Sequence, residues 1–150
     1  MTNAALVHYI KMVSQRYFNQ PFTHQAWFNK RLRTTGGRYH LADHHIEINP
    51  RFVQPQHSQA LLGIVLHELC HYHLHLAGKG YRHRDLDFKR QLAAVGGSRY
   101  APALTVPQVK WHYVCTYCGQ RYNRQRRLNV QRFVCGRCGG RLKLSQPATD

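Results

Sequence analysis

Residues 58–76 read SQALLGIVLHELCHYHLHL, and this stretch decides the fold. Apolar side chains would cover nearly every face of a helix formed here, so the stretch predicts a buried helix. Ser58 is its predicted N-cap, because a serine hydroxyl can accept a hydrogen bond from the first turn. Inside this helix, His67-Glu68-Leu69-Cys70-His71 forms an HExxH pattern. An ionised carboxylate is costly in such surroundings unless it has a partner.

The two histidines of this pattern predict a zinc site. Residues four apart lie on one helix face about one turn from each other, so His67 and His71 can bind a single ion. Glu68 is rotated by about 100 degrees from His67, which places its carboxylate beside the open position of the metal. There it can take a proton from water and pass it to a leaving amine. A purely structural zinc, or a hydrogen-bonded core histidine pair, is the alternative interpretation.

A catalytic zinc takes a third ligand from the protein. His83 is the predicted ligand, because the glycine-containing loop at residues 77–82 can reverse the chain and bring the next helix back to the metal. Asp87 is the alternative. His73 points away from the metal face, and His75 lies too far along the helix, so both are interpreted as packing or surface residues.

The remaining elements follow from hydrophobic periodicity. Residues 3–18 predict an amphipathic helix with Thr2 as its N-cap, and residues 83–95 predict a third helix that ends at Gly96-Gly97. Short alternating stretches between residues 22 and 49 predict a three-stranded meander. Its strand residues are Ala26 and Phe28, Tyr39 and Leu41, and Ile46 and Ile48.

Four cysteines near the C-terminus form two CxxC pairs and predict a second zinc site. The ligands are Cys115, Cys118, Cys135 and Cys138. Four thiolates fill a tetrahedron and leave no position for water, so this zinc should be structural, within a zinc ribbon whose strand-like residues are Tyr122, Leu128, Val130 and Phe133. Disulfides are the alternative, and the lack of a secretion signal argues against them. Cys70 is interpreted as a buried, inert thiol.

The charge balance predicts a polyanionic partner. The chain has 22 Lys and Arg against 6 Asp and Glu, a formal net charge of +16. Residues 111–149 contain eight of these basic residues and no acidic one. A solvated basic face is the alternative, but aromatic residues among the arginines favour nucleic acid, most simply DNA. The candidate contacts are Arg121, Arg124, Arg126, Arg127, Arg132 and Arg137.

The sequence HELCHYHLHLAGKGYRHRDLDFKRQL, beginning at His67, resembles the signature of SprT-like proteins. These are zinc metallopeptidase-like domains related to the Spartan protease, which degrades proteins crosslinked to DNA. The TTGGRY turn, the IEIN strand and the cysteine pairs resemble the same pattern. The resemblance implies that His67, His71 and His83 bind zinc and that Glu68 is the catalytic carboxylate. It also implies that the strand at residues 46–48 lies at the rim of the cleft, where a substrate peptide could pair with it.

The predicted fold class is therefore α+β. A zincin-like metallopeptidase domain at residues 1–97 is followed by a linker at 98–110, a four-cysteine zinc ribbon at 111–145 and a tail at 146–150. We expect a cytoplasmic monomer without a membrane segment.

The predicted function is zinc-dependent cleavage of DNA-associated proteins, with Tyr81 or His45 as candidates to stabilise the oxyanion. The alternative is a non-catalytic nucleic-acid-binding protein in which both zinc ions hold the fold. A protease with one dedicated protein partner is a third possibility.

Overall fold

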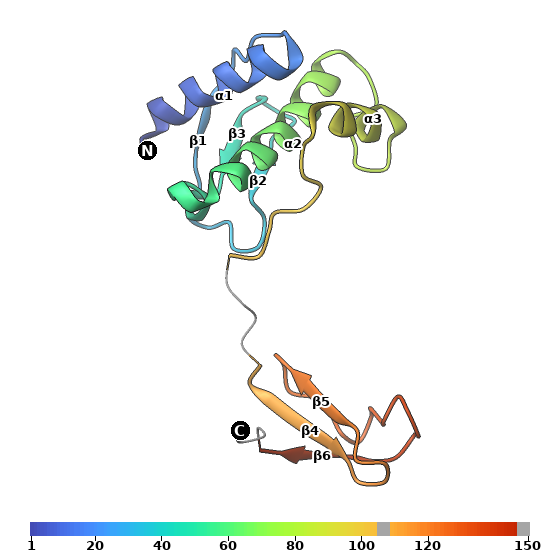
Figure 1. The fold of residues 1–150 in the computed structure, drawn as a ribbon. Coiled ribbons are helices and arrows are strands. Elements are labelled where there is room, and N and C mark those ends of the chain that lie inside the picture. The colour runs from blue at the N-terminus through green and yellow to red at the C-terminus, as the bar shows by residue number, and fades with distance from the viewer. Residues whose placement is uncertain (105–108, 147–150) are drawn as a thin grey trace. The chain divides into compact units, whose positions relative to one another are not determined.

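The computed structural model describes residues 1–104 and 109–146, which belong to two compact units, Met1–Leu104 and Thr105–Asp150 (Figure 1). The predicted linker and tail fall partly on residues 105–108 and 147–150, which lie outside the described residues. The first unit extends past the predicted boundary at residue 97, because the Ser98 N–H donates to the Gly63 carbonyl at 3.2 Å and residues 101 and 104 pack against the core.

Helix α1, Asn3–Phe18, forms where periodicity predicts it. The Thr2 hydroxyl accepts a hydrogen bond from the Ala5 N–H at 3.1 Å and so caps the helix as predicted. Asn19 ends the helix in the left-handed conformation, with φ 52°. The buried side of α1 packs against strand β1, Ala26–Phe28, and helix α2.

The sheet is not the predicted meander. Strand β3, Ile46–Ile48, lies between β1 and β2, Gly37–Tyr39, and it runs parallel to β1 and antiparallel to β2. All three residues of β3 are buried, as a central strand requires. The amide of Asn49 donates to the carbonyls of residues 32 and 35, which ties the β1–β2 connection across the end of β3. A buried amide just after β3 therefore holds the β1–β2 connection in place in this sheet.

Helix α2, Ser58–Leu76, is the buried centre of the first unit and contacts α1, β2 and α3. The prediction that Ser58 caps it is wrong, because two short 3-10 turns, Pro50–Phe52 and Pro55–His57, lead directly into the helix and His57 occupies the N-cap position without a side-chain bond. The helix begins with neither an acidic residue nor a side-chain cap. Its stability therefore comes from packing.

Helix α3, Leu86–Val95, begins later than the predicted residue 83. The Asp85 carboxylate accepts a hydrogen bond from the Arg82 N–H at 2.9 Å, and this turn keeps residues 82–85 out of the helix. Gly96 ends the helix with φ 71°, as predicted. The delayed start leaves His83 on a loop beside α2, free of helical geometry.

The second unit is a small antiparallel sheet of β4, Trp111–Cys115, β5, Arg121–Arg124, and β6, Leu142–Ser145, with β4 in the centre. Tyr122 lies in β5 as expected, but the other predicted strand residues, at 128, 130 and 133, lie outside the strands. The buried core contains little beyond Tyr113, Leu142 and two cysteines, too little to fold without a further cross-link.

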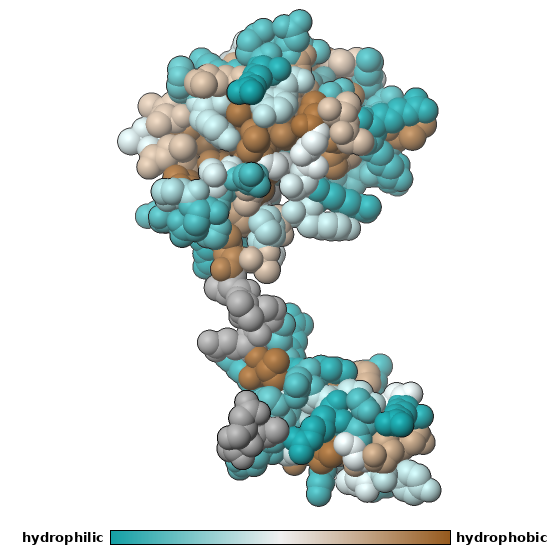
Figure 2. All heavy atoms as spheres, in the orientation of Figure 1, coloured by the Kyte–Doolittle hydropathy of each residue, from teal (hydrophilic) through white to brown (hydrophobic). Residues whose placement is uncertain are grey.

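In the described part of the chain, no helix combines the length and the apolar character needed to cross a membrane. The visible face of each unit carries mainly hydrophilic side chains with apolar ones scattered among them (Figure 2).

Candidate metal centre and active site

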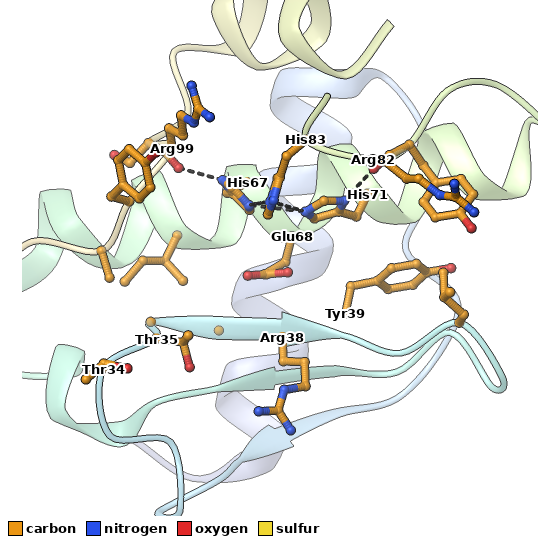
Figure 3. A pocket seen from close by; sticks show the side chains of 18 residues that line it. Thr34, Thr35, Arg38, Tyr39, His67, Glu68, His71, Arg82, His83 and Arg99 are labelled. Carbon is orange, nitrogen blue, oxygen red and sulfur yellow. Dashed lines mark hydrogen bonds between the residues drawn. The ribbon is translucent and has the colours of Figure 1, made fainter. Parts of the chain in front are cut away.

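Three histidine side chains from two different segments meet above the sheet (Figure 3). His67 and His71 project from α2, and His83 reaches them from the loop that precedes α3. Their Nε2 atoms are 3.1 Å apart between His67 and His71, 2.9 Å between His67 and His83, and 3.0 Å between His71 and His83. The structure thus brings together the three residues that the sequence singled out as ligands.

Backbone carbonyls determine which nitrogen of each α2 histidine carries the proton. His67 Nδ1 lies 2.7 Å from the Ser98 carbonyl oxygen, and His71 Nδ1 lies 2.6 Å from the Tyr81 carbonyl oxygen. A carbonyl oxygen only accepts hydrogen bonds, so both Nδ1 atoms donate and both Nε2 atoms present lone pairs. Facing lone pairs repel unless a cation lies among them. Zinc bound at about 2.0 Å would place tetrahedral ligands about 3.3 Å apart, so the three nitrogens fit this ion.

The surroundings of the α2 histidines keep them neutral. Burial lowers the pKa of His71 to about 4, and burial together with nearby His83 lowers the pKa of His67. Only a neutral imidazole can bind a metal. These two histidines are therefore ready to bind a cation without first losing protons.

Glu68 lies on the same helix as the histidines and points toward β2 (Figure 3). Burial raises the pKa of Glu68 to about 8, against the opposing influence of the Tyr39 backbone N–H and the Arg38 charge. A cation at the neighbouring histidines would stabilise the ionised carboxylate. A Cβ atom added at Gly37 would come within 3.0 Å of the Glu68 carboxylate, so the absence of a side chain on β2 makes room for this group.

A cleft of about 650 Å³ opens over these residues. It is lined by β2 and the preceding turn, by α2, by residues 81–83 and by residues 98–101. Residues 98–101 belong to the site, although the prolines that follow them predict a linker from residue 98 onward. In the sequence, only the adjacent glycines Gly36 and Gly37 indicate that β2 approaches α2 closely.

In the second unit, the four predicted cysteines form one cluster. Sγ atoms lie 3.4 Å apart between Cys115 and Cys138 and 3.7 Å apart between Cys118 and Cys135. All five cysteines of the chain are free, so the disulfide alternative is wrong for this structure. Backbone N–H groups point at Sγ of Cys115, Cys135 and Cys138, as they do when thiolates bind a metal.

Comparison with known proteins identifies both units. Residues 6–109 match the SprT-like family, and residues 109–146 match the SprT-like zinc ribbon domain. The chain belongs to the SprT-like family. A relative named "Protein SprT-like" from Lactiplantibacillus plantarum is 53% identical over 147 residues, which cover 96% of this chain and 99% of the relative. Proteins of the same name from Geobacillus kaustophilus and Enterococcus faecalis are each 51% identical, over 140 and 144 residues.

The match to the Geobacillus kaustophilus protein covers 91% of this chain and 94% of the relative. The match to the Enterococcus faecalis protein covers 95% of this chain and 94% of the relative. No solved structure matches the chain. The four-cysteine cluster and the ribbon match together support a structural zinc in the second unit of this SprT-like protein.

The edge of the cleft differs from what the resemblance implied. Strand β3 is the central strand, and the rim is formed by β2. Gly36 O accepts from Asn49 N at 2.8 Å, and His40 N donates to His45 O at 3.0 Å, so these alternate residues face β3. The backbone groups of Gly37 and Tyr39 consequently face the free edge of β2, beside the cleft.

The alternatives for the third ligand have other partners in this SprT-like fold. The Asp87 carboxylate accepts from the Gly80 N–H at 2.9 Å and braces the loop that carries His83. His73 Nε2 lies 2.7 Å from the Ser14 hydroxyl in the core, and His75 Nδ1 lies 2.6 Å from the Tyr39 hydroxyl.

The remaining candidates divide between the cleft and other parts of the chain. Tyr81 lines the cleft, whereas His45 lies outside it, which removes His45 as a candidate for the oxyanion. Cys70 is buried and burial raises its pKa to about 12, so it is the inert thiol that the sequence indicated. The candidate nucleic-acid contacts are all exposed on the ribbon unit, at Arg121, Arg124, Arg126, Arg127, Arg132 and Arg137.

His83 and Asp87, the two candidates for the third ligand, can be distinguished by the zinc content of their variants. We expect wild-type protein to hold two zinc ions and His83→Ala to retain only the ribbon zinc after exposure to a competing chelator, because two histidines alone bind zinc weakly. Asp87→Asn is the matched control and should keep both ions, since it only weakens a loop hydrogen bond. Elemental analysis distinguishes the two. Loss of one zinc from Asp87→Asn, with none lost from His83→Ala, would exclude His83 as a ligand.

Proposed function

We propose that this SprT-like chain is a zinc-dependent endopeptidase that acts on DNA-associated proteins. The observation that carries the proposal is the convergence of three imidazole Nε2 atoms, 2.9 to 3.1 Å apart, beside a buried carboxylate in an open cleft. A purely structural zinc site has no need of an adjacent carboxylate that is not a ligand. A hydrolytic site does, because a base must stand next to the water that attacks the peptide.

Bound zinc supplies Lewis acidity, which polarises a peptide carbonyl and lowers the pKa of a water molecule. His67 and His71 contribute fixed lone pairs, because the Ser98 and Tyr81 carbonyls hold their rings in place. Glu68 takes the proton released by water and passes it to the nitrogen of the leaving amine. Tyr81 lines the same cleft and is the remaining candidate to stabilise the oxyanion.

Strand β2 is suited to bind the substrate. The backbone groups of Gly37 and Tyr39 face its free edge, and Glu68 lies against the same strand. An extended peptide could add to this edge and would then lie along the cleft with its carbonyl groups near the histidines. This mode of binding relies on backbone hydrogen bonds and places few demands on side chains. It therefore suits a peptidase that must accept many different proteins.

The ribbon unit is suited to bind the DNA. Three exposed arginines stack on aromatic rings, with guanidinium carbons 5.4 Å from the Tyr122 centroid, 5.5 Å from that of Trp111 and 5.7 Å from that of Phe133. Tyr117 is 85% exposed, and a tyrosine ring this accessible can stack on an unpaired base. Aromatic rings beside arginines favour a single strand, whose bases are available for stacking.

The peptidase proposal depends on Glu68. Glu68→Gln should reduce the cleavage rate by about 10²–10⁴-fold, because the amide cannot accept the proton, and should leave both zinc ions in place. The assay is cleavage of a DNA-binding protein with and without single-stranded DNA, alongside elemental analysis of each variant. Wild-type protein that carries both zinc ions but cleaves no substrate on any DNA would favour the alternative, a nucleic-acid-binding protein without catalysis.

The DNA proposal depends on the ribbon arginines. The variant R124A/R127A/R132A should bind single-stranded DNA more weakly and show a slope of log K against log salt that is shallower by up to about 2, at about 0.7 for each phosphate contact. The matched control K11A/R16A/R90A removes the same charge from exposed positions on the helices of the first unit. Its slope should match the wild type. Equal slopes for all three proteins would contradict the assignment of DNA binding to the ribbon.

A further inference from the structure

A second group of metal-ligating side chains lies on the face of the sheet that is turned away from the helices. Residues alternate between the two faces of a strand, so Ile46 and Ile48 of β3 pack into the core while Glu47 projects from the opposite face. His40 follows β2 and His45 precedes β3, and their backbones are hydrogen bonded to each other. The antiparallel register therefore brings both imidazoles to the Glu47 carboxylate. None of the three residues lines the cleft.

The side-chain nitrogen and oxygen atoms of this cluster lie close together, but they are poorly aligned for hydrogen bonds. His40 Nε2 is 3.2 Å from one carboxylate oxygen of Glu47, and His45 Nε2 is 3.6 Å from the other. Both Nε2 atoms are shielded from water. Each lies within ion-pair distance of Glu47, yet neither makes a well-aligned hydrogen bond in the described residues. His45 is only 8% exposed. A buried polar nitrogen without a well-aligned hydrogen bond is destabilising by up to about 3 kcal/mol. An ion that both nitrogens and the carboxylate can bind would remove this cost.

Asp43 holds one ring nitrogen of the buried histidine in place. Its carboxylate oxygen accepts the Nδ1–H of His45. In the neutral ring, Nε2 is then left with a lone pair that faces a carboxylate oxygen of Glu47. Two acceptors face each other, and a cation between them would bind both. A carboxylate that holds a histidine through its other nitrogen is a common support for a metal ligand.

The Glu47 carboxylate is also held in position. Asn29 Nδ2 donates to Oε2 at 3.0 Å, and the ion pairs of Glu47 in the described residues are with His40 and His45 only. The Trp27 ring stacks on His45 with centroids 4.0 Å apart and covers the buried side of the cluster. Two ligands are thus supported by neighbours before any ion binds, and the third, His40, stands at the rim with 32% of its side chain exposed.

We infer that His40, His45 and Glu47 form a third metal site, which binds a divalent first-row transition metal ion such as Zn²⁺. Two imidazoles and a carboxylate are the ligands that these ions accept, and their donor atoms all lie within 4.8 Å of one another. The rings of His40 and His45 stack with centroids 3.8 Å apart. Binding therefore requires the His40 ring to tilt outward, into the solvent that its exposed side already faces.

The site would link the two strands nearest the cleft. His40 directly follows β2, which forms the cleft rim, while His45 directly precedes β3 and Glu47 lies in the middle of that strand. An ion at this position holds β2 and β3 in register from outside the cleft. The inference is separate from the proposed peptidase function, since none of its residues takes part in the chemistry assigned to Glu68.

The test is the number of Zn²⁺ ions bound by the full-length protein at micromolar free Zn²⁺, measured by elemental analysis after gel filtration in the same buffer. Wild type should hold one more ion per chain than His40→Ala and than Glu47→Gln. His8→Ala, which removes an exposed histidine from α1, is the matched control and should bind as many ions as wild type. This comparison of variants does not depend on how fully the other two sites are occupied.

Asp43→Asn tests the arrangement more finely. Asp43 touches no ion, so a structural cluster without metal would give no change in Zn²⁺ affinity, whereas loss of a supporting carboxylate should weaken the third site by about 10–100-fold. The affinity is read by competition with a chromophoric chelator. His40→Ala changes a partly exposed residue and should not unfold the protein. Zinc that this variant retains at the ribbon and in the cleft will show that the variant is folded. Equal zinc content and affinity in wild type, His40→Ala and Glu47→Gln would overturn the inference.

Discussion

Two hydrogen bonds from histidine rings to backbone carbonyls organise the first unit. His67 donates to the Ser98 carbonyl at 2.7 Å and His71 donates to the Tyr81 carbonyl at 2.6 Å. These carbonyls stand at opposite ends of the segment that contains α3, so the bonds also hold that segment against α2. Because the same bonds direct the Nε2 lone pairs toward His83, the fold and the metal centre depend on one set of contacts. An ion bound there would join α2 to the loop before α3.

The second constraint is the close approach of β2 to α2. An added Cβ at Gly36 would come within 2.4 Å of the Ile64 side chain, and one at Gly37 within 3.0 Å of Glu68. Bare backbone at these positions brings the outer edge of β2, which is an edge strand of this sheet, next to a buried carboxylate. The sheet therefore provides both a wall of the cleft and a surface on which a peptide can bind.

Much of this arrangement can be predicted from sequence because it is local. Helical periodicity gives α1 and α2, and the spacing of His67 and His71 gives two ligands on one face. The strand order cannot be obtained in this way, because it rests on the pairing of β3 with both β1 and β2, and local periodicity does not show which strands pair. The proposed third site cannot be predicted from sequence for a similar reason. Its residues have no motif spacing, and only the antiparallel register of β2 and β3 brings them together.

An X-ray structure of the zinc-replete protein, with anomalous data collected at the zinc edge, tests the three-histidine site most directly. We expect a peak about 2.0 Å from Nε2 of His67, His71 and His83, with no fourth protein ligand and with Glu68 beside the open position. A peak closed by a fourth side chain, or zinc found among the ribbon cysteines but absent from the three histidines, would contradict this assignment.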